Sequence, residues 1–376
     1  MNSPTVNNGS EGAADGVRRV FKILLAIFMY YLDLIVIAGM TSIFYVLAFF
    51  SYLVGKGYRD INDVLYETHE RFVVFCSMTL RGIKRHHYGD YGQIVNRGES
   101  VLVIGNHQVE SDYFTIAAAM EESGSLKRLR HVMKESLIWL PFVGAFLVNH
   151  GSFFIDRSKL NWDRFERNGT RLATSESPTS LLIYPEGTTW NNGEEVDGIF
   201  QKSDALARSC NREPFQHVLF PKHKGFYRLL SKFRNRLDAV YDVTVGYSST
   251  RSPEGRRLMA PGMIDFLNGA CPDVHFHLRR VSIKDVPQGE EEVRDFLIER
   301  FAEKDQLMDE FFKTGRFPSP TVELPPQSSF NFMRSTLVTI AAVLLAVTKF
   351  GLSIMPMYLG LPLVAAYIHV VYHLNS

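Results

Sequence analysis

The chain has 376 residues, of which 46% are hydrophobic and 22% are charged, and its formal net charge is +1. The charged fraction and the 12% aromatic content exclude a wholly disordered chain, and the net charge argues against a nucleic-acid-binding protein, which usually has a basic excess. Three cysteines are too few for a disulfide framework or a zinc cluster, and no metal site is expected. The mean hydropathy of −0.05 hides a concentration of apolar residues at the two ends.

The N-terminal region begins with a polar segment, residues 1–16, that we expect to be disordered. Residues 20–54 are then almost wholly apolar, with only Lys22 and Asp33 charged. As one helix this run would be ~52 Å long, against a hydrocarbon core of ~30 Å. It predicts a tilted span, a re-entrant pair or an interfacial helix within residues 17–56, with a buried core helix as the alternative.

The C-terminal region holds a second apolar run, residues 337–371, which a lysine, a glycine and two prolines interrupt. The run predicts two short membrane segments within residues 335–373, arranged as a hairpin, a shallow insertion or two crossings. A buried core helix is again the alternative. Residues 316–334 are expected to be a linker.

The middle of the chain, residues 57–315, alternates short apolar runs with amphipathic stretches. The runs predict strands at residues 100–105, 130–133, 152–155, 180–184, 218–220, 239–247 and 274–281. The stretches predict helices at residues 112–122, 136–146, 197–210 and 290–312, and one ending near residue 174. This alternation indicates an α/β fold with a mostly parallel sheet flanked by helices. In such sheets ligands bind beyond the carboxyl ends of the strands.

The first strand-end motif is residues 106–112 (NHQVESD), directly after the strand at 100–105. Asp112 can accept one ring N–H of His107, so that the other ring nitrogen can take a proton from a nucleophile. The alternative is a helix-capping Asp112 beside a surface histidine.

The second motif is residues 185–189 (PEGTT), after the strand at 180–184. Its acid, glycine and hydroxyls suit the binding of a polyol or phosphate, and the alternative is an ordinary turn. The third motif, residues 151–157 (GSFFIDR), places Arg157 just past a strand. Its guanidinium could clamp a phosphate, and the alternative is a surface ion pair.

The fourth motif is residues 218–225 (VLFPKHKG), in which Pro221 ends a predicted strand and two lysines follow. In this order and spacing the four motifs resemble those of the glycerolipid acyltransferases, the lysophosphatidic acid acyltransferase family. Residues 131–141, 237–245, 266–287 and 299–312 also resemble its epsilon-type members. The resemblance covers roughly residues 20–315, and the C-terminal apolar pair fits it too.

The resemblance implies an O-acyltransferase with the glycerolipid acyltransferase fold and membrane-embedded helices at both ends. It would transfer an acyl chain from acyl-CoA to the sn-2 hydroxyl of 1-acyl-glycerol-3-phosphate, giving phosphatidic acid in phospholipid biosynthesis. His107 would be the general base and Asp112 would orient it. No covalent acyl-enzyme and no cofactor are required, since acyl-CoA is a co-substrate. The expected location is the endoplasmic reticulum membrane, with a mitochondrial membrane as the alternative.

The same resemblance implies substrate-binding roles for residues in or near the motifs: Lys134, Arg157, Glu186, Gly187, Thr188, Pro221 and Lys222. Residues 186–188 would bind the glycerol-phosphate end, and Arg157 would contact phosphate. Pro221 would shape the wall of the acyl or acceptor channel, and Lys134 would lie near the site entrance.

One position departs from the family pattern, because Thr189 stands where relatives usually have an arginine. The phosphate charge would then be met by Arg157 together with Lys222 or Lys224. The acceptor could therefore differ, and lysocardiolipin or another lysophospholipid in phospholipid remodelling is the alternative. A non-catalytic lipid-binding relative is a further alternative, whereas the missing G-x-S-x-G elbow argues against a hydrolase.

A basic run follows the fourth motif, with six lysines and arginines and no acid in residues 222–236. Such a run can bind anionic lipid headgroups or the phosphates of CoA. The alternative is a solvated helix face.

Overall fold

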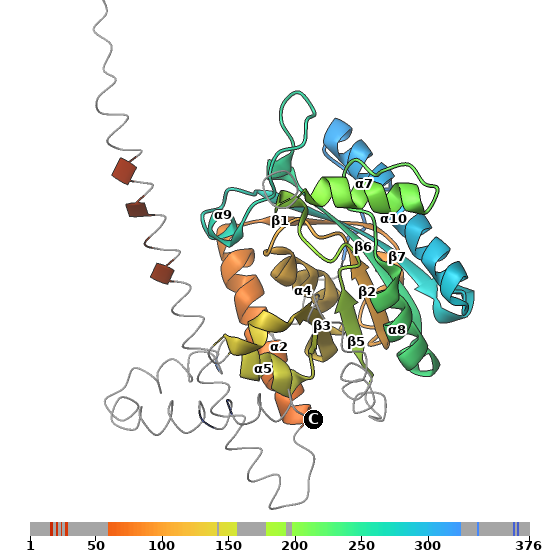
Figure 1. Cartoon of the computed structure of the whole chain (residues 1–376). Coiled ribbons are helices and arrows are strands. Elements are labelled where there is room, and N and C mark those ends of the chain that lie inside the picture. The colour runs from red at the N-terminus through yellow and green to blue at the C-terminus, as the bar shows by residue number, and fades with distance from the viewer. Residues whose placement is uncertain are drawn as a thin grey trace, which may run out of the picture.

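The computed structural model describes residues 59–140, 143–155, 178–192 and 198–324, together with isolated helical positions in the two terminal apolar runs (Figure 1). At its centre is one seven-stranded sheet in the order β1-β7-β6-β2-β5-β3-β4. The strands are β1 (Lys84–Gly89), β2 (Val101–Gly105), β3 (Leu129–Lys134), β4 (Phe153–Ile155), β5 (Ser180–Ile183), β6 (Ala239–Tyr247) and β7 (Asp273–Ser282). Neighbouring strands are parallel except β6 and β7, which confirms the mostly parallel α/β fold.

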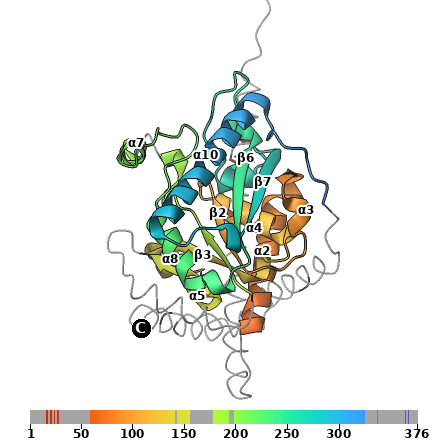
Figure 2. The ribbon, with the colours of Figure 1, turned by 90° about the vertical axis from the view of Figure 1, so that its right-hand side faces the viewer.

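Helices cover both faces of the sheet (Figures 1 and 2). On one face lie α2 (Arg59–Ser77), α4 (Asp112–Glu122), α5 (Val143–His150) and the short α9 (Met263–Leu267), with α3 (Tyr91–Ile94) beside β1 and β7. On the other face lie α8 (His223–Phe233) and α10 (Glu290–Thr314), and α7 (Ile199–Ser209) packs beside α10. The central strands β2, β5 and β6 are therefore buried from both sides.

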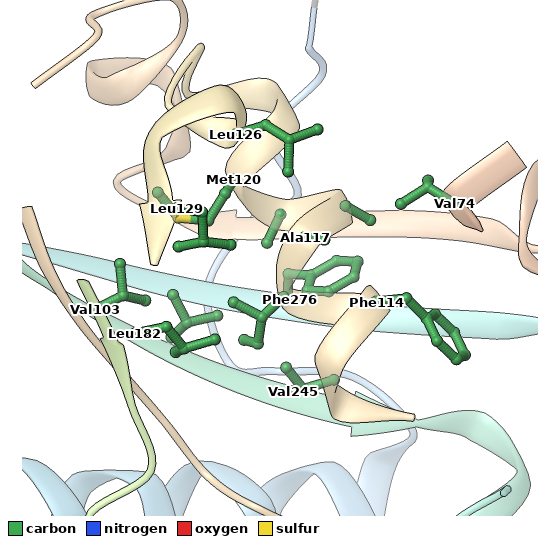
Figure 3. Close-up of a cluster of buried hydrophobic side chains, with 14 of the residues drawn as sticks. Val74, Val103, Phe114, Ala117, Met120, Leu126, Leu129, Leu182, Val245 and Phe276 are labelled. Carbon is green, nitrogen blue, oxygen red and sulfur yellow. The ribbon is translucent and has the colours of Figure 1, made fainter. Parts of the chain in front are cut away.

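The two-sided burial explains why the central strands are continuous apolar runs. In β2, Val101 and Val103 pack in the cluster under α4, whereas Leu102 and Ile104 pack in the cluster under α8 and α10. Figure 3 shows the first cluster, in which strand side chains such as Val103 meet α4. Successive side chains of a strand point to opposite faces, so both sets must be apolar.

Most predicted elements are confirmed. The helix at 112–122 and the strand at 239–247 match α4 and β6 residue for residue, and the others differ by one or two residues at each end. The predicted helix at 136–146 consists of a 3₁₀ turn, η3 (Glu135–Trp139), followed by α5. The predicted helix ending near residue 174 lies outside the described residues.

The predicted strand at residues 218–220 is wrong, because this segment is irregular. Side chains, not a neighbouring strand, satisfy its backbone donors. The Asp305 carboxylate accepts the N–H groups of residues 216–218, with 2.6 Å to the nitrogen of His217. The N–H of Phe220 donates to Ser203 Oγ at 2.8 Å. Apolar composition alone cannot distinguish such a buried loop from a strand.

The helices α2 and α3 and the strand β1, all before residue 100, were not predicted. Helix α2 packs its buried residues, such as Tyr66 and Val74, against the cluster under α4. Strand β1 (KRHHYG) is polar and lies at the edge of the sheet, where it pairs with β7 and forms an isolated bridge to Thr321. An edge strand needs little apolar surface, and so β1 lacks the pattern that identifies a strand from sequence.

A buried ion pair joins α10 to the sheet below the carboxyl end of β2. Lys304 Nζ contacts the Asp242 carboxylate and donates to the carbonyl of Val243 at 2.6 Å. Burial lowers the pKa of Lys304, and the Asp242 charge opposes that shift. Both side chains are buried, so the pair specifies where α10 crosses β6.

Among the helices in the described ranges, none combines the length and the apolar character that a membrane crossing requires. The predicted disordered N-terminus and the two predicted membrane segments fall outside these ranges, apart from the isolated positions.

Candidate active site

The loop between β2 and α4 carries the first motif and lies at the carboxyl edge of the sheet. His107 is in this loop, and Asp112 is the first residue of α4. The structure brings the two side chains together, with 2.9 Å between His107 Nδ1 and Asp112 Oδ2. Residues five positions apart can make this contact because the loop turns back onto the N-terminus of α4.

The carboxylate of Asp112 is fully buried and takes three further hydrogen bonds. The N–H groups of Gln108 and Val109 donate to Oδ2 at 2.5 and 3.0 Å, and the Tyr247 hydroxyl donates to Oδ1 at 2.5 Å. These bonds leave the carboxylate a single orientation, directed at the histidine. Asp112 therefore has the geometry of a group that orients a base.

The same contact determines which ring nitrogen of His107 is available. Asp112 accepts a hydrogen bond from the Nδ1–H group, so Nε2 is the unprotonated nitrogen in the neutral ring. Nε2 has no hydrogen-bond partner within the described part of the chain, and 17% of the His107 side chain is exposed. It can therefore accept a proton from an alcohol that reaches the site.

Tyr184, at the end of β5, covers one face of the imidazole. The centroids of the Tyr184 and His107 rings are 4.1 Å apart and the ring planes differ by 15°. The Tyr184 hydroxyl donates to the carbonyl of Asp112 at 3.1 Å. Sequence reasoning missed this role, although the aromatic residue stands directly before the PEGT motif.

Glu186 joins two of the predicted motifs through its buried carboxylate. Oε1 accepts the N–H of His107 at 2.9 Å, and Oε2 accepts the N–H of Leu219 at 3.3 Å. Burial raises the pKa of Glu186 to about 8, although these two bonds and the charge of Arg257 oppose the shift. Glu186 therefore positions the histidine loop, and its contact with a glycerol phosphate stays a prediction.

The chain after the PEGT motif runs alongside the histidine loop. The N–H of Trp190 donates to the carbonyl of His107 at 2.9 Å, and the N–H of Asn191 donates to that of Gln108 at 3.0 Å. Thr188 and Thr189 lie just before this pairing and are half-buried. The chain that follows the second motif is thus hydrogen-bonded to the histidine loop.

Two amides that the sequence did not single out attach the histidine loop to β6. Asn106 donates to the carbonyl of Val245 at 3.0 Å and accepts its N–H at 2.8 Å, so its side chain imitates a strand residue. Gln108 Nε2 also donates to the Val245 carbonyl, at 2.8 Å. The position of Asn106 in the first motif, directly before His107, could have indicated its role from the sequence.

Arg257, in the loop between β6 and α9, also contacts the site. Its guanidinium lies 3.5 Å from the centroid of the Trp190 ring and donates to Gln108 Oε1 at 3.1 Å. Burial lowers the pKa of Arg257 to about 9, and the nearby Glu186 and Asp112 oppose this shift. No sequence pattern marked this arginine, because its role depends on a loop that returns from far along the chain.

A cavity of about 370 Å³ lies at the carboxyl ends of β3, β4 and β5. Its lining is mainly apolar, from these strands and from α7, α8 and α10. Basic side chains also line it: Lys222, His223, Lys224 and Arg294. Tyr184 contributes to the cavity wall and stacks on His107, and so it connects the two.

Three predicted binding residues line this cavity: Gly187, Pro221 and Lys222. Gly187 has a φ of +74°, and a Cβ there would lie 3.2 Å from Lys222 Nζ. The N–H of Lys222 donates to the carbonyl of Pro185 at 2.9 Å. The second and fourth motifs therefore meet, and the glycine makes room for the lysine.

The remaining predicted residues are farther from the pair or not placed. Lys134 is exposed at the end of β3, next to Met133, which lines the cavity. Arg157 lies outside the described residues. In the basic run, Arg234 donates to the carbonyls of Ile283 and Val286, so part of this run stabilises the fold.

Comparison with known proteins identifies the family. A model described as "Acyltransferase" matches residues 90–248, and one described as "Acyltransferase C-terminus" matches residues 265–341. The mouse 1-acyl-sn-glycerol-3-phosphate acyltransferase epsilon is 30% identical over 272 residues, which cover 70% of this chain and 73% of the mouse protein. The chain belongs to the 1-acyl-sn-glycerol-3-phosphate acyltransferase family. As a member it is an O-acyltransferase, as the motifs implied.

Other members of this acyltransferase family are also similar. The probable 1-acyl-sn-glycerol-3-phosphate acyltransferase 5 of Arabidopsis thaliana is 31% identical over 231 residues, covering 60% of this chain and 57% of the plant protein. The 2-acyl-1-lysophosphatidylinositol acyltransferase of Saccharomyces cerevisiae is 27% identical over 276 residues, covering 64% and 68%. The crystal structure of the 1-acyl-sn-glycerophosphate acyltransferase of Thermotoga maritima has a TM-score of 0.45 at 17% identity, covering 77% of this chain and 98% of that one.

Proposed function

We propose that this acyltransferase moves a fatty acyl chain from acyl-CoA to the sn-2 hydroxyl of 1-acyl-glycerol-3-phosphate, forming phosphatidic acid. The observation that carries the proposal is the His107–Asp112 pair, whose Nε2 is accessible and whose imidazole stacks on Tyr184, a residue in the wall of a largely apolar cavity. Acyl-CoA is a co-substrate, and the chemistry requires no resident cofactor.

The reaction follows from the geometry of the pair. His107 Nε2 takes the proton of the acceptor hydroxyl as the hydroxyl oxygen attacks the thioester carbonyl carbon. Asp112, held by its four donors, stabilises the imidazolium that forms. The tetrahedral intermediate collapses with cleavage of the C–S bond, and the imidazolium returns its proton to the leaving thiolate. The products are the new ester and CoA.

The cavity supplies the two environments that these substrates need. Its apolar wall, with Pro221 and Phe220, suits an acyl chain, because burial of a methylene group is favourable by about 0.8 kcal/mol. Lys222 and Lys224 offer positive charge to a phosphate at the same cavity. We propose that Arg157 adds to this charge and that Thr188 binds the glycerol phosphate. Lys134 would then lie where substrate enters.

The residue at position 189 supports a different lysophospholipid as the acceptor. Thr189 is a half-buried neutral residue directly after the EGT sequence, where relatives usually have arginine. The similar yeast protein is named for lysophosphatidylinositol, so headgroups vary among such relatives. Lysocardiolipin or another lysophospholipid is therefore the alternative acceptor, in phospholipid remodelling.

We further propose that both terminal apolar runs are embedded in a bilayer, which also holds the lysophospholipid acceptor. Their composition supports this, since few charged residues interrupt either run. The expected membrane is that of the endoplasmic reticulum, with a mitochondrial membrane as the alternative.

The test is transfer from labelled oleoyl-CoA to a panel of lysophospholipids, for the wild type and His107→Ala. Loss of the base should lower the rate by about 10²–10⁴-fold. The matched control is His86→Ala, because His86 Nε2 lies 2.8 Å from Asp273 in a second His–Asp pair, between β1 and β7. This variant should keep the wild-type rate.

Each result of the panel has a distinct meaning. An unchanged rate in His107→Ala would contradict the assignment of the base. Free fatty acid as the only labelled product would identify a hydrolase. Acylation of lysocardiolipin or lysophosphatidylinositol, but not of lysophosphatidic acid, would replace the proposed acceptor by the alternative.

A further inference from the structure

Four apolar side chains project into solvent from a short segment after Arg257. They are Leu258, Met259, Met263 and Ile264, with 47%, 55%, 45% and 53% of their surfaces exposed. We call this segment, residues 258–264, the apolar loop. It comprises the chain before α9 and the first residues of that helix, on the α2 side of the sheet (Figure 1).

The apolar loop is backed by the core that supports the catalytic pair. Phe266, on the inner side of α9, is fully buried and packs edge-on against Phe114 of α4, with 5.0 Å between ring centroids. Phe266 also packs against Tyr247 at 5.5 Å, and Tyr247 donates to Asp112. The segment that carries the exposed side chains is therefore packed against the hydrophobic core.

Hydrogen bonds attach the loop directly to the neighbours of His107. The hydroxyl of Ser111 donates to the carbonyl of Pro261 at 2.7 Å. The Asn191 side chain donates to the carbonyl of Ala260 at 2.9 Å and accepts its N–H at 3.0 Å. The position of the apolar loop is therefore fixed relative to His107, so any surface that binds the loop also positions the candidate active site.

Charged side chains surround the apolar loop without an excess of either sign. Residues 251–265 contain three arginines and two acids, and one of the arginines, Arg257, is turned into the candidate active site. The Arg256 side chain is 81% exposed, with Glu254 at 3.8 Å. The second acid, Asp265, turns back to accept the N–H of Gly262 at 3.0 Å. Exposed apolar side chains flanked by polar and charged residues are typical of a segment that enters a membrane surface.

We propose that the apolar loop inserts into the surface of a lipid bilayer and so holds His107 at the level of the headgroups. The proposal rests on the proposed function, because a lysophospholipid acceptor has its acyl chain in the membrane. A second copy of the chain is less suited than a bilayer to cover the apolar loop. The four side chains expose roughly a few hundred Å², whereas a stable protein interface buries at least about 1,200 Å².

The first experiment measures insertion in the full chain, reconstituted in vesicles of phosphatidylcholine and phosphatidylglycerol. Met259→Cys, in a Cys210→Ser background, carries an environment-sensitive fluorophore, because the remaining Cys76 and Cys271 are buried. Nitroxide-labelled lipids should quench this fluorophore. The matched control is Gln306→Cys, on the exposed side of α10 across the sheet, which should not be quenched.

The second experiment measures transfer by Met259→Gln/Ile264→Gln to two acceptors. With lysophosphatidic acid in the same vesicles the rate should fall about tenfold, as expected when two inserted apolar side chains become polar. With a short-chain, monomeric lysophosphatidic acid the rate should remain that of the wild type, since neither side chain contacts the catalytic pair.

Several outcomes would overturn the inference. Equal quenching at positions 259 and 306 would show that the loop does not insert. Equal losses on both acceptors would show that the double variant damages the site itself. Disulfide crosslinking of two chains through Met259→Cys, without quenching, would identify a second copy as the occupant. Failure of the wild type with both acceptors would contradict the proposed acceptor, while the quenching result would still test insertion.

Discussion

The ring of Tyr184 lies almost parallel to the imidazole of His107, 4.1 Å away, and its hydroxyl donates to the backbone of Asp112. One side chain thus contacts both His107 and Asp112, the pair that we propose as catalytic. It also lines the cavity that we propose for substrate. The orientation of the base therefore depends on β5 as well as on its own loop.

Replacing Tyr184 should separate the effect of stacking from that of the hydroxyl. Tyr184→Phe keeps the ring, so its kcat should stay within about threefold of the wild type. Tyr184→Leu removes the stack, and its kcat should fall at least about tenfold because the imidazole is less well oriented. Steady-state kinetics with both variants check this. Equal kcat values for the two would contradict a role for stacking.

Tyr247→Phe should weaken both stability and catalysis. It leaves Asp112 Oδ1 buried without its donor, which costs about 1–3 kcal/mol. The control is Tyr241→Phe, because Tyr241 lies in the same strand and donates to Glu99 at 2.7 Å, away from His107. Both variants should lower the Tm, and only Tyr247→Phe should lower kcat. A normal kcat in Tyr247→Phe would show that this hydrogen bond serves the fold alone.

Glu186 should make the stability of the protein depend on pH. Burial raises its pKa from 4.5 to about 8, so the folded state favours the protonated carboxyl. The stability that this group contributes is present below about pH 4.5 and is lost as the pH rises through about 8. Glu186→Gln does not titrate and has one acceptor oxygen for two N–H donors.

The Tm of Glu186→Gln should therefore lie below that of the wild type near pH 5, and the gap should narrow towards pH 8. Thermal melts in detergent across this range measure the gap. Glu299→Gln, on the exposed side of α10, should follow the wild type at every pH. A gap that stays constant with pH would contradict the raised pKa of Glu186.

Cys210 should report on occupancy of the cavity. It is half-buried in the cavity lining, whereas Cys76 and Cys271 are buried elsewhere. A maleimide should modify Cys210 in a fast phase that Cys210→Ser lacks. Saturating acyl-CoA should slow this phase by about tenfold or more, which mass spectrometry can follow. Modification at the same rate with and without acyl-CoA would place the ligand outside the cavity.

Gly187→Ala should impair substrate binding beyond its cost in stability. A left-handed alanine costs about 1–2 kcal/mol, and the new Cβ would also displace Lys222. Gly82→Ala is the matched control, because Gly82 has a similar φ of +66° and no neighbour within 4 Å. Both variants should lose a similar amount of Tm, but only Gly187→Ala should raise the KM. A KM raised equally in both would refute the link to Lys222.

Local pattern was enough to predict most of the fold and the pairing of two residues. The helix at 112–122 and the strand at 239–247 carry continuous local signals, and the structure has both at the predicted bounds. Strand β1 was not predicted, and the loop at 218–220 was wrongly predicted as a strand. The pairing of β1 with β7 and the hydrogen bonds from the loop to Asp305 both depend on distant parts of the chain.

By itself the sequence determined an α/β fold with a histidine and an aspartate five residues apart at a strand end, because strand periodicity and a five-residue spacing are local properties. The acyltransferase activity came from the resemblance of the four motifs to a known family. Only the tertiary structure decided that Tyr184 stacks on His107, that Glu186 holds the histidine loop and that Arg257 contacts it. These contacts join residues about 70 to 150 positions apart, and packing of both sheet faces is what brings such segments together.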